Sequence, residues 1–364
     1  MFAGADHSID LLWFAWQDGD IGAEMAGALA ERARAGVRVR VLLDGYGARH
    51  VGRSAVRRMR LADCEVLSHH PVPSLRPTVW DLRTHRRVLV CDEVVAFTGG
   101  TGISDSWTGD GRHPGQWRDT VVRVRGPAVA GLRAAFAQPW LQAQARRGHD
   151  GPVSTADCFP PLRPVGTSAV QVLRPPSGPG WNDAALALGV LFQSARTRVR
   201  VASPYVRLPG WLRSLVCDAA RRGVEVQLLV SGPHVERPTV HLQAEREYEP
   251  LLEAGVQIWR YQASLLHTKV VTVDGELSMV GTTNLDVRSL ALTEQACLLV
   301  ADHGATAQLD THVDDDLTTS AEVDDTSWRT RSLSHRVLET TADVIGRPLQ
   351  GWSGTGSVGQ RPGP

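Results

Sequence analysis

The sequence His267-Thr-Lys269-Val-Val-Thr-Val-Asp274, followed by Gly281-Thr282, is informative about the fold because the same pattern occurs earlier in the chain. The earlier copy reads His85-Arg-Arg87-Val-Leu-Val-Cys-Asp92, followed by Gly99-Gly100. In both copies a base stands two positions after the histidine, an aspartate seven, a glycine fourteen and a small residue fifteen. Composition alone would produce one such match in roughly one chain per five hundred. We therefore interpret the pair as an internal duplication.

The repeat extends beyond the histidines. Strand-like segments at 8–12 and 198–202 are each followed by an amphipathic helix, at 22–35 and 210–222, and then by an alternating strand, at 37–43 and 224–230. A glycine after a basic last turn marks the end of each predicted helix. The order strand, helix, strand predicts an α/β fold with mostly parallel sheets.

The repeat also sets the expected domain boundaries. We expect a first half at 1–150, a Pro- and Gly-rich linker at 151–182 and a second half at 183–302. A helical extension should follow at 303–348, and the Gly-, Ser- and Pro-rich tail at 349–364 is expected to be disordered.

Composition narrows the class of protein. The chain of 364 residues is 42% hydrophobic and 21% charged, which is typical of a globular protein. Lys plus Arg equals Asp plus Glu at 39 each, so the basic excess usual in proteins that grip long nucleic acids is missing. The five cysteines are scattered without a Cys-x-x-Cys pair, which indicates neither a zinc site nor a disulfide framework. No signal peptide or membrane-spanning segment is recognised, so a cytoplasmic protein is expected.

The spacing within each motif predicts a reactive group. Residues two apart on a strand share a face, so His85 lies beside Arg87 and His267 beside Lys269. If the halves pack together, two imidazoles and two cations surround one anionic centre, which suits phosphoryl transfer without a metal ion or cofactor. Asp92 and Asp274, at predicted tight turns, complete the expected catalytic set.

Backbone amides and small polar side chains after each motif are expected to bind phosphate. The expected phosphate-binding residues are Gly99, Gly100, Gly281, Thr282 and Asn284.

At these residues the sequence resembles the phospholipase D superfamily, whose mark is a duplicated His-x-Lys-x4-Asp motif. Further segments, including Arg34 to Gly45 and Trp117-Arg-Asp119, resemble the cardiolipin synthase branch. The resemblance runs from about residue 5 to 348 and implies two tandem phospholipase D-like α/β sandwich halves, packed as a pseudo-two-fold dimer. It also implies a ping-pong reaction through a covalent phosphatidyl-histidine, with phosphatidylglycerol as donor and acceptor in that branch.

Three positions depart from the family pattern. Arg87 replaces a lysine, Gly102 stands where an asparagine would match Asn284, and Gln295 stands where a glutamate commonly orients the second histidine. A nucleophilic imidazole benefits from a carboxylate on its other nitrogen. We therefore expect Asp119 to orient His85 as the nucleophile, unless it pairs with Arg118 or Arg123 on the surface. His267 is then the general acid, with Gln295 and Glu294 beside it.

Three functions are compatible with the sequence. The first is a phosphatidyltransferase or phospholipase on glycerophospholipid, most like cardiolipin synthase, acting as a monomer peripheral to the inner face of the membrane. The second is a nuclease or phosphodiesterase of the same mechanism, which the neutral charge disfavours. The third is a catalytically impaired lipid-binding scaffold, supported by Arg87 and Gly102.

Overall fold

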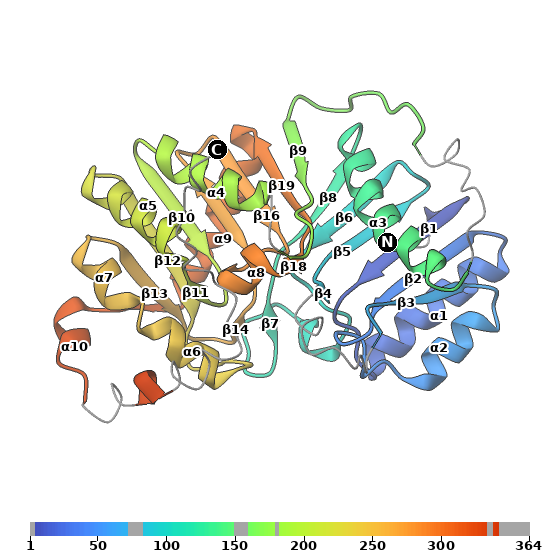
Figure 1. Cartoon of the computed structure of the whole chain (residues 1–364), viewed down its shortest axis with the longest axis horizontal. Coiled ribbons are helices and arrows are strands. Elements are labelled where there is room, and N and C mark those ends of the chain that lie inside the picture. The colour runs from blue at the N-terminus through green and yellow to red at the C-terminus, as the bar shows by residue number, and fades with distance from the viewer. Residues whose placement is uncertain (1–3, 72–82, 149–158, 179–181, 333–337, 342–364) are drawn as a thin grey trace, which may run out of the picture.

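The computed structural model describes residues 4–71, 83–148, 159–178, 182–332 and 338–341. Figure 1 shows two α/β lobes side by side, the first drawn in blue to teal and the second in green to red. Each lobe is built on one central sheet, with helices on both of its faces. The α/β class predicted from the sequence is confirmed. The tail at 349–364 lies outside the described residues.

The sheet of the first lobe has the strand order β3-β2-β1-β5-β6-β8. The strands are β1 (Ser8–Trp13), β2 (Arg38–Asp44), β3 (Glu65–His69), β5 (Arg87–Cys91), β6 (Val95–Gly99) and β8 (Val121–Arg125). Helices α1 (Asp20–Arg34) and α2 (Arg53–Arg60) pack on one face, and α3 (Ala128–Ala145) packs on the other. Because both faces are covered, β1 and β5 are buried along their whole length.

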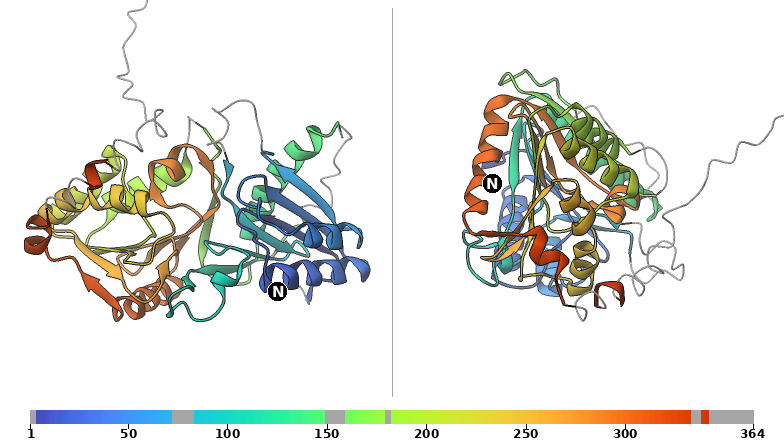
Figure 2. Two further views of the ribbon diagram at one scale, coloured as in Figure 1. Left: turned by 90° about the horizontal axis from the view of Figure 1, so that it is seen from below. Right: turned by 90° about the vertical axis from the view of Figure 1, so that its left-hand side faces the viewer.

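The sheet of the second lobe has the order β20-β13-β12-β10-β15-β16-β19-β9. Its strands are β9 (Ala169–Leu173), β10 (Arg198–Ala202), β12 (Glu225–Ser231), β13 (Gln257–Tyr261), β15 (Val270–Val273), β16 (Leu277–Gly281), β19 (Cys297–Ala301) and β20 (Ser320–Glu322). Helices α4 (Asp183–Ser194), α5 (Gly210–Arg221) and α7 (Tyr248–Glu253) pack on one face. Helix α9 (His303–Leu317) packs on the other, as Figure 2 shows with α9 in orange.

Shorter elements lie between these. They are the 3-10 helix η3 (Asp105–Trp107), helices α6 (Pro238–Glu245), α8 (Val287–Ala291) and α10 (Asp325–Arg329), and the paired strands β11 (Val206–Arg207) and β17 (Leu285–Asp286). No helix in the described part of the chain has the length and apolar character needed to cross a membrane.

The expectation of mostly parallel sheets is wrong. In the first sheet β1, β2 and β3 are parallel, but β5 pairs antiparallel with both β1 and β6, and β6 with β8. The second sheet repeats this pattern, with parallel pairing only among β10, β12 and β13. Each histidine motif forms the first strand of a hairpin, closed by residues 92–94 or 274–276. So short a connection can only join antiparallel neighbours.

Two predicted boundaries also differ from the structure. The expected linker at 151–182 contains β9, which forms the edge of the second sheet beside β19. The expected extension at 303–348 contains α9, which covers a face of that sheet, and β20, which pairs with β13. The second structural unit therefore includes parts of both segments, because its sheet needs a covering helix and these edge strands.

Two short parallel ladders join the lobes. Strand β4 (Arg83–Thr84) pairs with β18 (Thr293–Glu294), and β14 (Leu265–Leu266) pairs with β7 (Trp117–Arg118). In each ladder one strand comes immediately before a motif histidine and the other comes from the opposite lobe. The ladders thus place the two histidines where the lobes meet.

Candidate active site

The first motif histidine is held by the second lobe. The His85 amide donates to the Glu294 carbonyl at 2.8 Å. The His85 Nδ1 atom lies 3.0 Å from both Gln295 Oε1 and the Thr282 carbonyl oxygen. Because both neighbours are acceptors, Nδ1 carries the proton. The Nε2 atom then carries the lone pair and accepts from Arg87 Nη1 at 3.2 Å.

The Gln295 side chain is itself fixed. Its Oε1 atom accepts from Thr282 Oγ1 at 2.6 Å, and its Nε2 atom donates to Thr293 Oγ1 at 2.6 Å. Gln295 is fully buried, so this network sets the position of the His85 ring. Gln295 was expected beside the second histidine, but its side chain contacts the first.

The second motif histidine is held by the first lobe. The His267 amide donates to the Arg118 carbonyl at 2.7 Å, and His267 Nδ1 lies 2.6 Å from Asp119 Oδ2. The Asp119 carboxylate also accepts from Trp107 Nε1 at 3.0 Å and from the Thr120 amide at 2.8 Å. The expectation that Asp119 orients His85 is therefore wrong. The β7–β14 ladder carries Asp119 across the lobe boundary to His267.

Burial and cations keep both imidazoles neutral in the free protein. Burial, with the charges of Arg87 and Lys269, holds the pKa of His85 well below its ordinary value. Burial and the Lys269 ammonium lower the pKa of His267 to about 4, although Asp119 acts in the opposite direction. Both cations act on both rings, so the two histidines share one electrostatic environment.

The cations themselves respond to burial. Burial lowers the pKa of Lys269 to about 7, with Asp119 opposing this change and Arg87 adding to it. Burial lowers the pKa of Arg87 to about 10, so its charge is retained near neutral pH. An arriving phosphate anion would favour the protonated form of Lys269 and of both imidazoles.

Aromatic rings line the histidines. The Phe14 ring lies 4.8 Å from the His85 ring, and those of Trp107 and Trp117 lie 5.5 and 5.1 Å from the His267 ring between centroids. A Cβ atom at Gly102 would overlap the Trp107 ring. The indole that donates to Asp119 thus occupies the space that a side chain at position 102 would need. Phe14 was not identified from the sequence, because it does not belong to a recognisable motif.

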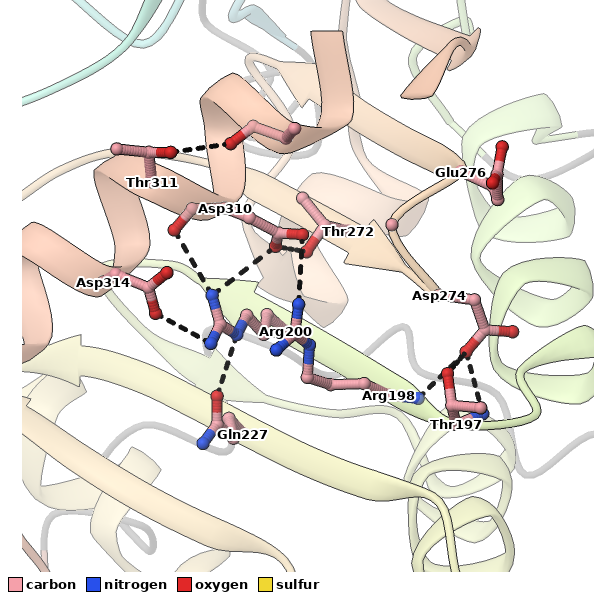
Figure 3. A network of polar contacts seen from close by, with 12 residues as sticks. Thr197, Arg198, Arg200, Gln227, Thr272, Asp274, Glu276, Asp310, Thr311 and Asp314 are labelled. Carbon is pink, nitrogen blue, oxygen red and sulfur yellow. Dashed lines mark hydrogen bonds and ion pairs between the residues drawn. The ribbon is translucent and has the colours of Figure 1, made fainter. Parts of the chain in front are cut away.

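Asp92 and Asp274 do not join the two imidazoles. Asp92 accepts from the backbone amides of residues 6–8 at 2.7 to 2.9 Å. Asp274 accepts from those of residues 196–198 at 2.9 Å, as Figure 3 shows for Thr197 and Arg198. Both lie at the hairpin turns, at the opposite end of β5 and β15 from the histidines. Their contacts connect each hairpin to the start of β1 or β10, which corrects the expectation of a catalytic role.

The glycines after each motif serve close packing. A Cβ atom would overlap the Thr120 carbonyl at Gly99, the Ala296 carbonyl at Gly281 and the Asp119 carboxylate at Gly100. The Thr282 hydroxyl is used by Gln295. Of the expected phosphate-binding side chains, Asn284 alone keeps a buried polar atom, Oδ1, without a hydrogen-bond partner in the described part of the chain.

The Glu294 side chain contacts His69 and not the imidazoles of His85 and His267. Its Oε2 atom is 3.8 Å from His69 Nε2. Burial opposes its ionisation, yet His69 and the Arg86 charge bring its pKa to about 2. Its backbone, through the β4–β18 ladder, is what contacts His85.

The fold and the paired histidine motifs define a protein of the phospholipase D class. Residues 189–317 match the family model described as cardiolipin synthase, PLD-like domain. The cardiolipin synthase A proteins of Yersinia pseudotuberculosis serotype O:1b (strain IP 31758) and Yersinia pestis bv. Antiqua (strain Angola) are each 34% identical over 341 residues, covering 92% of this chain and 69% of theirs. The chain belongs to the cardiolipin synthase family.

Solved structures agree on the fold. The phosphatidylserine synthase of Haemophilus influenzae Rd KW20 superposes with a TM-score of 0.72 at 15% identity, over 96% of this chain and 90% of that chain. The polyphosphate kinase of Porphyromonas gingivalis gives a TM-score of 0.56 at 12% identity, over 94% of this chain and 50% of that chain.

Proposed function

We propose that the protein is a phosphatidyltransferase that acts on glycerophospholipid through a phosphohistidine at His85. The observation that carries this proposal is the difference between the partners of the two imidazoles. His85 is held by the neutral amide of Gln295, and His267 by the carboxylate of Asp119. A carboxylate stabilises an imidazolium and a neutral amide does so far less. Once a bound phosphate favours protonation, the proton that the reaction donates is therefore assigned to His267.

The roles follow from that proton. His85 Nε2 attacks phosphorus and forms the N–P bond, while His267 donates its Nε2 proton to the departing alkoxide. Arg87 and Lys269 neutralise the phosphoryl oxygens. In the second half-reaction His267 takes the proton of the incoming alcohol, whose oxygen attacks phosphorus and releases His85. His85 keeps the role of nucleophile expected from the sequence, for the opposite reason: it is the histidine without the carboxylate.

Family membership and the aromatic walls support a lipid substrate. The cardiolipin synthase relatives support a phospholipid substrate, and we propose phosphatidylglycerol as both donor and acceptor. We also propose that the protein acts as a monomer, because one chain supplies both histidines and both partner residues. We place this monomer at the inner face of the membrane, since the proposed substrate is a membrane lipid. A polynucleotide substrate is disfavoured by equal numbers of acidic and basic residues, 39 each.

Trapping the intermediate tests the roles. A short-chain phosphatidyl-p-nitrophenol carries a leaving group that needs little protonation. We expect His267→Asn to release one equivalent of nitrophenol and then stall, with the phosphatidyl group on His85, since no base activates the acceptor. His85→Asn should release none. An adduct on His267 in the His85→Asn protein would overturn the assignment.

A substrate assay tests the reaction class. Purified protein is given labelled phosphatidylglycerol vesicles, phosphatidylcholine vesicles or single-stranded DNA. We expect cardiolipin and glycerol from the first. Turnover of DNA with none of phosphatidylglycerol would instead establish a nuclease, and no turnover of any substrate would favour a binding protein.

A further inference from the structure

Three ligand-type side chains meet at the lobe boundary, outside the catalytic pair. His69 ends β3, His70 follows it and Glu294 lies in β18 of the opposite lobe. One donor atom from each can be chosen so that all lie within 4.8 Å of one another. Neighbouring residues on a strand normally point to opposite faces. Here His70 has a φ of 50°, which ends the alternation, and its ring packs against that of His69 with centroids 3.9 Å apart.

These donor atoms are buried and make no hydrogen bond within the described residues, although His69 Nε2 and Glu294 Oε2 approach each other to 3.8 Å. His69 is fully buried, and neither of its ring nitrogens has a hydrogen-bond partner among the described residues; the same holds for His70 Nε2 and Glu294 Oε2. A buried polar atom left without a partner costs about 1–3 kcal/mol. Several together at one point indicate a missing ligand.

The spacing distinguishes a bound ion from a direct ion pair. A charge-assisted N–H···O contact closes to about 2.7–2.9 Å, whereas His69 Nε2 and Glu294 Oε2 are 3.8 Å apart. Ligands at about 2.0–2.2 Å from a tetrahedral zinc lie about 3.4 Å from one another. A shift of a few tenths of an ångström would bring this pair to that distance.

Two neighbouring guanidinium groups are directed to backbone oxygen atoms. The Arg83 Nη1 atom donates to the His70 carbonyl oxygen at 2.6 Å. The nearby Arg86 guanidinium donates to carbonyl oxygens of Gln295 and Ala135 at 3.0 Å, so its hydrogen bonds are directed to those atoms.

We propose that His69, His70 and Glu294 form a site for a divalent transition-metal ion of the zinc type, which links the two lobes. Two imidazoles and one carboxylate leave a fourth position for water. The ion would fix β18, whose next residue is Gln295, the partner of His85. It would stabilise the site without taking part in phosphoryl transfer, so the inference does not depend on the proposed function.

Metal binding by the purified full-length chain tests this proposal. After treatment with a chelator, the protein is titrated with Zn2+ by calorimetry and with Co2+ by visible absorption. We expect one equivalent of tightly bound Zn2+ and a tetrahedral cobalt spectrum. Glu294→Gln and His70→Gln should each weaken binding at least about 100-fold, more than the loss typical of outer-shell changes. Bound Zn2+ should raise the thermal midpoint of the wild type and not of these variants.

Two control variants keep the test specific. His303 and Glu276 form an exposed pair at the same distance, 3.8 Å, so Glu276→Gln should bind Zn2+ as the wild type does. His85→Gln should also bind it, because the site is separate from the catalytic histidines. The proposal fails if the wild type binds no stoichiometric Zn2+ below about 1 mM, or if every variant that folds by circular dichroism, Glu294→Gln or His70→Gln, keeps the wild-type affinity.

Discussion

At the scale of the residue, Asp119 and Gln295 make two similar imidazoles chemically different. Each follows a strand of a cross-lobe ladder and reaches the Nδ1 atom of the opposite histidine. One is a charged acceptor and the other a neutral one. The position of the proton in the pocket therefore depends on a single difference between carboxylate and amide.

Asp119→Asn should lower kcat/KM by about 100- to 10,000-fold at neutral pH. Asp119 favours the protonated form of His267, which is needed to expel the leaving alcohol. Without it the pKa of His267 falls further, so the decline of kcat/KM with rising pH should begin at a lower pH. A pH profile on phosphatidylglycerol measures both changes. An unchanged profile in a folded variant would show that Asp119 has no such role.

Gln295→Glu should remain active, but the acid limb of its kcat/KM profile should move to a higher pH. His85 must be neutral to attack, and a carboxylate at Nδ1 would raise its depressed pKa. A raised pKa means that His85 is protonated over a wider range, so activity is lost at a higher pH as the solution is acidified. The acid limb of kcat/KM measures this shift. An acid limb at the wild-type pH would contradict the proposed role of His85.

The sequence predicted the four motif residues that we place in the active site, but not their partners. The duplicated spacing identified His85, Arg87, His267 and Lys269, because strand periodicity places such pairs on one face. Spacing along one half carries no information about contacts between halves, so Asp119 was given to the wrong histidine. Asp92 and Asp274 belong to the same motif, yet the strands carry them away from the reactive end.

At the scale of the element, ion pairs with buried arginines hold α3 on the first sheet and α9 on the second. On α3, Arg133 pairs with Glu93 at 2.7 Å and with Asp10 of β1 at 3.3 Å, while Arg40 of β2 grips Asp10 at 2.6 Å. On α9, Asp310 and Asp314 bind Arg200 of β10, as Figure 3 shows. Each helix is thus held in register on its sheet.

Asp10→Ala should lower the free energy of unfolding by about 3–5 kcal/mol, because it removes the carboxylate shared by two buried arginines. Urea unfolding followed by tryptophan fluorescence measures the change. The exposed pair of Arg221 and Asp218 offers a control, since Asp218→Ala should cost less than about 1 kcal/mol. Equal losses in the two variants would refute the argument.

Strand and helix positions near the motifs were predicted well, since 8–12, 37–43 and 210–222 correspond to β1, β2 and α5. Strand direction was not predicted correctly, because the local pattern of apolar residues is the same in parallel and antiparallel strands. Strand β9 was missed because the Pro- and Gly-rich sequence around it indicated a linker. Its pairing with β19 is a tertiary contact that overrides that local signal.

At the scale of the whole molecule, the lobes share a core and a buried hydrogen bond. The cluster around α3 and α9 contains apolar residues of both sheets. The hydroxyls of Thr120 and Thr268, one from each lobe, lie 2.6 Å apart between Oγ1 atoms. Both threonines are buried, so this contact reports directly on the joint between lobes.

Thr268→Val should cost about 1–3 kcal/mol, because it leaves the buried Thr120 hydroxyl without its partner. Adding Thr120→Val should recover part of that loss, since both positions are then apolar and of similar shape. Urea unfolding of the two single variants and the double variant gives the coupling energy. Strictly additive losses would mean that the two hydroxyls do not interact.

The crossing of partners between lobes has a consequence for how such a catalyst can specialise. In an assembly of two identical chains, whatever residue supports one histidine must also support the other, so neither can be committed to a single task. Joining both copies in one polypeptide removes that constraint. One supporting residue can then become an amide while its counterpart remains an acid. The sequence itself then determines which histidine donates the proton in the first step.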